Sequence, residues 1–265
     1  MACSAATMTG DGLEWSWEPD DFAALWLDDG RDRFPRPLHF QSRFRFVEDY
    51  RRHAARVRAN YSRDDLMDIV RAFEVLQASD VRIEIVGGTT KTNDGTARRY
   101  RVLGVRNEVS AAVLSQTCSA EADGPIRLRL CHPDHLPARI VHRLLPAEPG
   151  REPQAEFHRQ DVLDDRDAHF DNSRRTQLRD SYRKLIGRPS DGGGSAALYL
   201  GPLLSRTDPL HFVEWRDITD DGRYTEWQTI DRLRIRPTTP KDLTAQFAAW
   251  FDKARRRLDA DTEVW

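Results

Sequence analysis

Between Val81 and residue 130, short runs of alternating apolar residues are joined by brief connections. Val81, Ile83 and Ile85 alternate with polar residues, and apolar runs follow at 100–103, 111–114 and 126–130. Alternation with a period of two is typical of strands that bury one face. The connections are too short for the crossover helix that parallel strands need, so we predict an antiparallel meander of about four strands.

Helical patterns flank this meander on both sides. Pro19 opens a first helix. A longer helix follows, and its predicted apolar face comprises Phe46, Val47, Tyr50, Ala54, Val57 and Tyr61. Ser62 and Asp65 have the spacing of a capping box, which predicts that another helix begins there. After the meander, residues 135–145 carry the apolar spacing of a further helix.

The second half of the chain repeats this plan. A predicted basic helix at 172–186 precedes four strand-like runs, at 197–204, 210–215, 224–227 and 233–235, and a final helix begins near Thr239. Residues 146–153 contain three prolines and a glycine, which predicts a hinge between the halves. We therefore predict an α+β fold of antiparallel sheets flanked by helices, with two pseudo-repeated halves in one compact domain.

The predicted boundaries follow from the same patterns. Residues 1–12 are small, polar and without periodicity, so we expect a flexible N-terminus there. A single α+β domain is expected at 13–258, with halves of about 13–150 and 155–258.

The charge balance argues against a general nucleic-acid binder. The chain has 41 basic and 43 acidic residues and a formal net charge of −2, whereas such a protein needs an excess of Lys and Arg to displace counterions. No apolar run approaches the roughly 20 residues that span a bilayer, so we predict no membrane insertion. The first ten residues lack the basic and apolar regions of a secretory signal.

Three widely spaced cysteines, Cys3, Cys118 and Cys131, do not suggest a disulfide scaffold. Together with the missing signal and membrane segments, this predicts a cytoplasmic protein. The oligomeric state stays open.

The run from Cys131 to His135 is the one most suggestive of catalysis. Thiolate and imidazole are zinc ligands, and they also form nucleophile–base pairs. A closed zinc site needs four ligands, however, and no second pair completes it; Pro133 also interrupts a helical face that would join Cys131 and His135. We predict no metal site and no catalytic residue. The alternative function is a hydrolase or metal-dependent enzyme that uses this cluster.

Residues 87–95 form a polar, glycine-rich segment between two predicted strands. The segment is similar to a phosphate-binding loop, but Thr90 stands where that loop has Gly before its Lys, and no helix follows it. We predict a long hairpin loop, and long polar loops often carry recognition. Residues 192–194 predict a second, flexible glycine loop.

Several short motifs near the two ends of the chain occur in an order that is informative about its family. Near the N-terminus these are residues 22–26 of the first helix and the Phe34-Pro-Arg-Pro-Leu38 segment. Near the C-terminus they are Gly194 before a strand, Trp215-x-Asp217, the turn Gly222-Arg223-Tyr224, and Arg234-Ile235-Arg236-Pro237 before the last helix. In this order the chain, over about residues 13–258, resembles the EspG family of type VII (ESX) secretion-associated proteins of actinobacteria. Asp217-Ile218-Thr219 departs from the family's more usual Asp-Thr.

The resemblance implies a cytosolic chaperone for PE–PPE substrate pairs, which keeps them soluble and directs them to one secretion system. It implies a compact α+β protein of two similar halves, with no cofactor and no reaction. It also implies that the partner binds the loop between the family's second and third strands, which lies here between the predicted strands that begin at Val81 and Tyr100, together with a face formed by the second half. That loop maps here onto Gly87, Gly88, Thr89, Thr90, Lys91, Thr92, Asn93, Asp94, Gly95 and Arg98. Because the loop has few apolar anchors, we expect the binding hot spots elsewhere, on aromatic residues near the end of the sheet.

Overall fold

The computed structural model describes residues 7–9, 12–28, 30–92, 96–119, 122–163, 173–205 and 207–262. Its strands are β1 (Thr7–Thr9), β2 (Gly12–Trp17), β3 (Val81–Thr89), β4 (Arg98–Arg106), β5 (Ala111–Cys118), β6 (Asp123–Cys131), β7 (Ala155–His158), β8 (Ser190–Leu200), β9 (His211–Ile218), β10 (Gly222–Gln228) and β11 (Arg232–Pro237). Its helices are α1 (Pro19–Trp26), α2 (Val47–Ala59), α3 (Arg63–Gln77), α4 (Leu136–Val141), α5 (Arg159–Leu163), α6 (Ser173–Ile186) and α7 (Pro240–Thr262), with a short 3-10 helix η1 at Pro133–His135.

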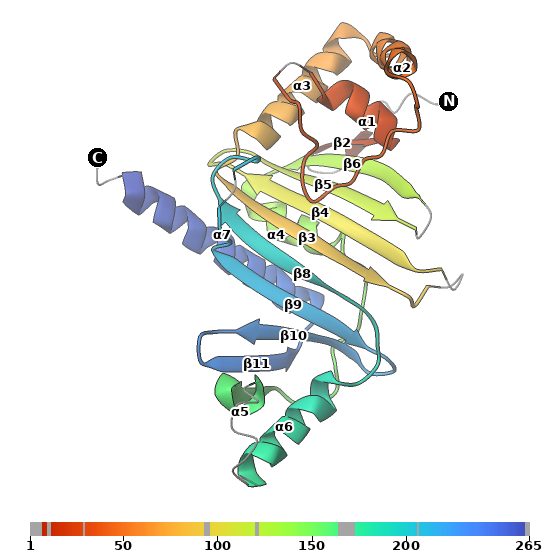
Figure 1. The fold of residues 1–265 in the computed structure, drawn as a ribbon. Helices are drawn as coiled ribbons and strands as arrows, with labels where there is room; N and C mark the ends of the chain where they lie inside the picture. Colours follow the sequence, from red (N-terminus) through yellow and green to blue (C-terminus); the bar gives the residue numbers. More distant parts are fainter. Residues whose placement is uncertain are drawn as a thin grey trace.

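The strands form one sheet of eleven strands in the order β1-β2-β6-β5-β4-β3-β8-β9-β10-β11-β7. Every neighbouring pair is antiparallel. The predicted meander is β3 to β6, and the α+β class with antiparallel strands is confirmed (Figure 1). At the middle of the sheet β3 pairs with β8, so strands from the two parts of the chain lie side by side.

Helices cover the two faces of the sheet differently. On one face α4 and α7 pack over the central strands, in a core that includes Ile83, Val102, Val113, Ile140, Leu198 and Phe247. On the other face α1, α2 and α3 lie over the strands at one end, in a core that includes Trp15, Phe22, Trp26, Phe73, Leu103 and Leu128. At the opposite end of that second face, α5 and α6 pack on a smaller core that includes Phe157, Leu185, Tyr224 and Leu233.

The strand order is compatible with two similar halves. Counted outward from the β3–β8 pair, each side holds a four-strand meander followed by a fifth strand, which is β2 on one side and β7 on the other. The equivalence of the halves and the boundaries at 13–150 and 155–258 stay predictions. In the predicted flexible terminus, β1 pairs with β2 as an edge strand, while the remainder of residues 1–11 lies outside the described residues.

Several local expectations are met by side-chain contacts. Ser62 caps α3 in a capping box with Asp65, as its spacing predicts. At the start of α7, the Asp242 carboxylate accepts from the Thr239 backbone N–H at 2.9 Å, and the Thr239 hydroxyl accepts from the Asp242 N–H at 3.1 Å. The two helices therefore begin where short polar side chains satisfy the free N–H groups of their first turns.

The predicted apolar face of α2 is wrong at its start. Phe46 and Val47 are 61% and 60% exposed, whereas Ala54 and Val57 are buried. The helix is held instead by His53, whose Nε2 lies 2.7 Å from the Asp21 Oδ1 atom of α1. Only the second half of α2 therefore contributes to the core.

Candidate functional site

The predicted hairpin loop is shorter than the sequence suggests. Gly87, Gly88 and Thr89 belong to β3 and pair with β4 on one side and β8 on the other, so their assignment to a loop is wrong. Thr90, Lys91 and Thr92 lie in the loop, and Arg98 begins β4. Asn93, Asp94 and Gly95 lie outside the described residues.

Close packing between neighbouring groups explains why glycine occupies these positions in the sheet. Gly87 and Gly88 lie opposite Gly194 and Gly193 of β8, and the predicted loop at 192–194 is likewise strand. A Cβ atom at Gly87 would overlap the ring of Tyr100 and lie 2.6 Å from the Gly193 carbonyl oxygen. Glycine is required here by the close approach of neighbouring groups. Burial raises the pKa of Tyr100 to about 12, so its hydroxyl stays protonated.

Asp191 of β8 holds the start of the loop in place. Its backbone carbonyl accepts from the Thr90 N–H at 2.6 Å and from the Thr90 hydroxyl at 3.0 Å. Its carboxylate accepts from the Thr219 hydroxyl at 2.8 Å and lies 3.6 Å from the Lys91 Nζ atom. The loop is therefore anchored to the second half of the chain as well as to its own strands.

Beside the loop lies a cleft of about 810 Å³, bordered by the linker after α4 and by the β9–β10 turn. Its lining is largely charged and includes Lys91, Arg151, Glu148, Asp191, Asp217 and Asp221. Burial alone would raise the pKa of Asp221, but hydrogen bonds from the Tyr224 hydroxyl, the Arg151 N–H and the Arg188 guanidinium outweigh it and lower the pKa. Asp220, at φ 58°, turns the chain in the predicted hairpin.

A strip of the sheet between the two groups of helices has no described helix over it (Figure 1). Val86 of β3, Ser195 and Ala197 of β8, and Phe212 and Glu214 of β9 present their side chains here, and we name these five residues the open face. Val86 lies opposite Ser195, which lies opposite Glu214, and Ala197 lies opposite Phe212. Val86 and Phe212 are 45% and 48% exposed. The open face is thus a flat, partly apolar surface with small residues in its middle strand.

The predicted loop continues directly from the open face. Gly88 follows Val86 on the same side of β3, because side chains alternate along a strand, and Thr90 begins the loop immediately beyond. Gly88 and Thr90, two of the residues implied by the resemblance, therefore lie at the end of the open face.

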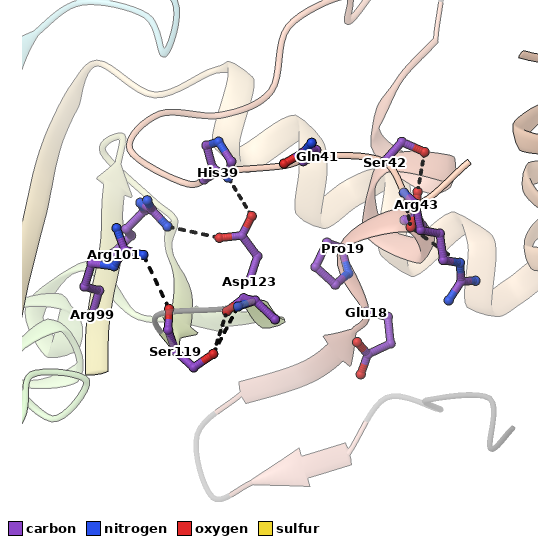
Figure 2. A pocket seen from close by; sticks show the side chains of 12 residues that line it. Glu18, Pro19, His39, Gln41, Ser42, Arg43, Arg99, Arg101, Ser119 and Asp123 are labelled. Atoms are coloured by element: carbon purple, nitrogen blue, oxygen red, sulfur yellow. Dashed lines mark hydrogen bonds and ion pairs between the residues drawn. The ribbon is translucent and has the colours of Figure 1, made fainter. Parts of the chain in front are cut away.

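A polar cleft of about 610 Å³ borders the open face at β4 (Figure 2). Arg101 lies opposite Val86 in register and, with Arg99, His39 and Asp123, lines this cleft. The Arg99 guanidinium donates to the Ser119 carbonyl oxygen at 3.4 Å. This side of the open face is therefore rich in guanidinium groups.

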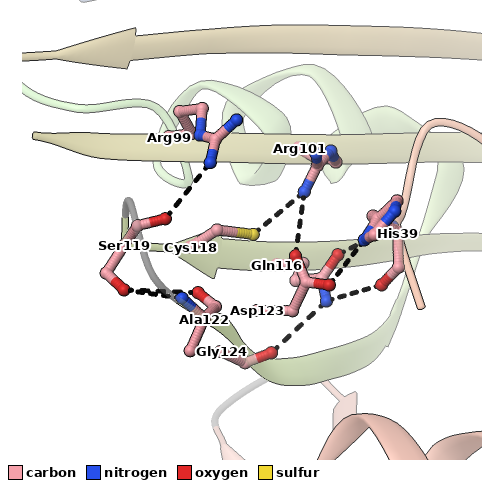
Figure 3. A network of polar contacts seen from close by, with 9 residues as sticks. All are labelled: His39, Arg99, Arg101, Gln116, Cys118, Ser119, Ala122, Asp123 and Gly124. Carbon is pink, nitrogen blue, oxygen red and sulfur yellow. Dashed lines mark hydrogen bonds and ion pairs between the residues drawn. The ribbon is translucent and has the colours of Figure 1, made fainter. Parts of the chain in front are cut away.

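A hydrogen-bond network fixes this border (Figure 3). The Gln116 side chain accepts from the His39 N–H and donates to the His39 carbonyl oxygen, both at 2.9 Å. His39 Nδ1 lies 2.5 Å from Asp123 Oδ2, and Arg101 donates to Asp123 Oδ1 at 3.4 Å and to Cys118 Sγ at 3.0 Å. Burial would raise the pKa of Asp123, but the hydrogen bonds from His39 and Cys118 lower it overall. The segment before α2 is in this way tied to the sheet.

The opposite border of the open face is acidic. Glu226 of β10 lies opposite Glu214 in register. The Tyr182 hydroxyl of α6 lies 3.5 Å from both carboxylate oxygens of Glu226, and burial, followed by the charge of Glu226, raises the pKa of Tyr182. The open face is therefore bordered by Arg101 along β4 and, toward α6, by the exposed Glu214 and the buried Glu226.

Cys131 and His135, on which the enzyme alternative depends, lie on two successive elements, β6 and η1. Cys131 ends β6 within the core and is 8% exposed, and His135 ends the 3-10 helix η1. Within the described ranges no three His, Cys, Asp or Glu side chains are placed to hold a metal ion. No helix in the described part of the chain combines the length and apolar character needed to cross a membrane.

Phe212 belongs to none of the motifs that the sequence displays. A usable signal exists at 211–216, where Val213 and Trp215 alternate with Phe212, Glu214 and Arg216. Such alternation shows that the two groups lie on opposite faces. Which face lacks a covering helix cannot be deduced from the strand itself.

Comparison with known proteins gives one family and one similar fold. The sequence profile of the EspG family matches residues 18–249. The type VII secretion system chaperone EspG5 of Mycobacterium tuberculosis, solved in complex with a PE25–PPE41 dimer, has a TM-score of 0.51 and 12% sequence identity, covering 88% of this chain and 93% of that chain. At this identity the similarity concerns the fold.

A 12:0-ACP thioesterase from Umbellularia californica has a TM-score of 0.18 and 10% identity, covering 88% of this chain and 100% of that chain, and supports no conclusion. No curated protein matches the sequence. The EspG profile, in contrast, extends over most of the chain, from α1 to α7, and so the protein belongs to the EspG family.

Proposed function

We propose that this protein is a cytoplasmic chaperone of type VII secretion that binds a PE–PPE-like substrate pair, keeps it soluble and directs it to one secretion system. Membership of the EspG family and the similarity of its fold to EspG5, whose structure contains a PE25–PPE41 dimer, support this function. The role needs shape and surface chemistry only, without a catalytic group or a cofactor.

The open face is the single observation that carries the proposal. A partner helix laid along β3, β8 and β9 would cover the exposed side chains of Val86 and Phe212. The small side chains of Ser195 and Ala197 leave room for a helix backbone to approach the sheet. Exposed apolar surface of this kind, rimmed by polar residues, is typical of protein-binding sites. The aromatic side chain expected as a hot spot is then Phe212.

The charges beside the open face orient the partner. Arg101 borders it along β4, and the exposed Glu214 lies toward α6. A helix with acidic residues on one flank and basic residues on the other would meet opposite charges on both borders. Such complementarity mainly sets register and association rate.

The loop residues contribute at one end of this surface. Thr90, Lys91, Thr92 and Arg98 offer hydrogen bonds and positive charge, and Asn93, Asp94 and Gly95 complete the proposed binding loop. Gly87, Gly88 and Thr89 act within β3 and allow the close packing from which the loop projects. We propose that the loop contacts the tip of the partner while Phe212 supplies the main apolar contact.

Co-expression with PE–PPE pairs encoded by the same genome tests the function. The protein carries an affinity tag, and co-purified chains are identified by mass spectrometry. A stoichiometric PE–PPE pair is expected, and its identity also gives the substrate and the secretion system. Recovery of the tagged protein alone with every pair contradicts the proposed function.

A matched pair of variants tests the site. Phe212→Asp should abolish co-purification, because it places a charge in the apolar contact, while folding is preserved because the side chain is half exposed. Val109→Asp serves as the control, because Val109 is 76% exposed and lies between β4 and β5, outside the open face. Equal recovery of the partner with both variants would show that the open face is not the binding site.

A further inference from the structure

A second groove lies on the other face of the sheet, between α7 and strands β9 to β11. Its volume is about 420 Å³, within the range of small-molecule sites. The lining is mostly apolar and includes Val213, Thr225, Trp227, Ala245, Ala249 and Trp250. Because Val213 alternates with Phe212 along β9, this groove is separated from the open face by the thickness of the sheet.

The groove exists because of the side chains that α7 presents. Ala245 and Ala249 are too short to fill the space between the helix and Trp227 of β10, which is 44% exposed. In the first half, α4 packs closely on the sheet at Gly104 of β4. A Cβ atom added at Gly104 would lie 2.9 Å from Ile140 Cγ1 of α4. The groove is therefore bordered by elements of the second half, α7 and strands β9 to β11.

One end of the groove carries unsatisfied polar groups. The His211 ring stacks on Trp250, with centroids 5.2 Å apart and 19° between the planes, and its Nε2 atom is buried without a hydrogen-bond partner among the described residues. Burial, and then the charge of Lys253, lowers the pKa of His211. Within the described ranges no carboxylate forms an ion pair with Lys253. An anion placed here would meet the positive charge of Lys253 and lie beside the His211 ring.

The other charged groups in the lining are already engaged. Arg234 donates from Nε and Nη2 to Glu156 Oε2, at 3.1 and 2.9 Å, and Arg236 donates to Gln246 Oε1 at 3.1 Å. Asp242, the one acidic residue in the lining, caps α7 through Thr239. Arg234 is therefore already paired with a carboxylate, whereas Lys253, at the other end of the groove, has no such ion pair among the described residues.

We propose that this groove binds a small amphiphilic carboxylate, with its head group beside Lys253 and His211 and its hydrocarbon chain along Val213, Trp227 and Ala249. Between Asp242 and Lys253 the helix advances about 16 Å, at 1.5 Å per residue, so the groove admits an extended chain. The site is independent of the open face and of the proposed secretion partner.

Titration calorimetry with octanoate, octanol and octylammonium tests the charge preference. Octanoate should bind most tightly, because it pairs with Lys253, and octylammonium most weakly. Lys253→Gln should lower the affinity for octanoate about fivefold, the size of a partly exposed ion pair, and leave octanol unchanged. Lys241→Gln, on the first turn of the same helix and outside the groove lining, is the matched control and should bind octanoate like the parent.

Filling the groove tests the placement of the chain. Ala249→Phe should abolish binding of both octanoate and octanol, and a thermal melt of the variant shows whether it folds; if it does not, Lys253→Gln still decides the outcome. Octanoate that does not bind the parent, equal affinities for octanoate and octylammonium, or an unchanged octanoate affinity in Lys253→Gln would each overturn the proposal.

Discussion

The Arg223 guanidinium of β10 donates two hydrogen bonds to the Asp217 carboxylate of β9, with Nε–Oδ1 and Nη2–Oδ2 distances of 2.7 and 2.9 Å. Arg223 is 2% exposed, and its Nη2 atom also donates to the Leu145 carbonyl oxygen at 3.0 Å. Bidentate ion pairs of this geometry are among the stronger polar contacts in proteins. This pair joins the linker after α4 to the second half of the sheet.

Removing the Asp217 carboxylate should therefore lower the stability of the folded protein. Asp217→Ala leaves a buried guanidinium without its partner, and we expect a loss of about 3–5 kcal/mol in the free energy of unfolding. Urea denaturation followed by tryptophan fluorescence measures it. Asp208→Ala, at an exposed position, should change stability by less than about 0.5 kcal/mol. A similarly small effect of Asp217→Ala would contradict the structural role of the pair.

The glycine pairing between β3 and β8 makes a second prediction. Gly87→Ala should destabilise the protein by about 1–3 kcal/mol, because the new methyl group meets the Tyr100 ring and the Gly193 carbonyl oxygen. Gly30→Ala is the control, since the nearest atom to its Cβ, Asp28 Oδ1, is 3.6 Å away. Equal melting temperatures of the two variants would refute the close packing at Gly87.

Shortening the loop separates its binding role from its structural role. Replacing residues 91–96 by Asn-Gly leaves β3 and the Thr90–Asp191 contacts in place, so the melting temperature should stay within a few degrees of the parent. Binding of the co-purified PE–PPE pair should weaken by tenfold or more in a pull-down titration. If the shortened protein binds the pair as tightly as the parent, the loop takes no part in recognition.

The cap of α7 predicts how the stability of the protein changes at low pH. The Thr239 hydroxyl, and then the Thr239 backbone N–H, lower the pKa of Asp242. Because the folded-state pKa is the lower one, the stabilisation is present above the unfolded value of about 3.9 and is lost as the pH falls through the folded value. Asp242→Ala should cost about 1 kcal/mol at neutral pH.

The difference between parent and Asp242→Ala should shrink as the pH is lowered below the unfolded-state pKa of about 3.9. Denaturation curves across this range measure it, with Asp252→Ala, an exposed position in the middle of the same helix, as the control. A difference that stays constant down to the lowest pH at which the protein folds would show that the carboxylate charge does not act at the cap.

The order and type of most elements could be predicted from the sequence, because periodicity and capping are local. The meander of β3 to β6 and the caps at Ser62 and Thr239 are examples. The glycine segments were mistaken for loops, because their strand conformation is dictated by neighbours about a hundred residues away in the chain. Strand β7 and helix α5 were missed, since neither is long enough to show a clear period.

Only one part of the candidate site, the loop, can be predicted from the sequence. The loop at 90–92 follows from its composition and from the family resemblance, and the structure places it beside the open face. The proposed role of Phe212 depends on the absence of a described helix over the face of β9 that carries its side chain, which is a tertiary property. Likewise, the exposure of Phe46 depends on how far α1 and the sheet extend along α2, and no local pattern encodes it.

The position of β3 also has a consequence for how this chain is made. All nine residues of β3 pair with β4 on one side and with β8 on the other. A nascent chain cannot complete the second pairing until Leu200, the last residue of β8, has left the ribosome. Until then β3 is an edge with unpaired N–H and C=O groups, the kind of surface through which incomplete chains associate. The pairing of β3 with β8, which supports the open face in the finished protein, is therefore completed late, and β3 needs protection in the nascent chain.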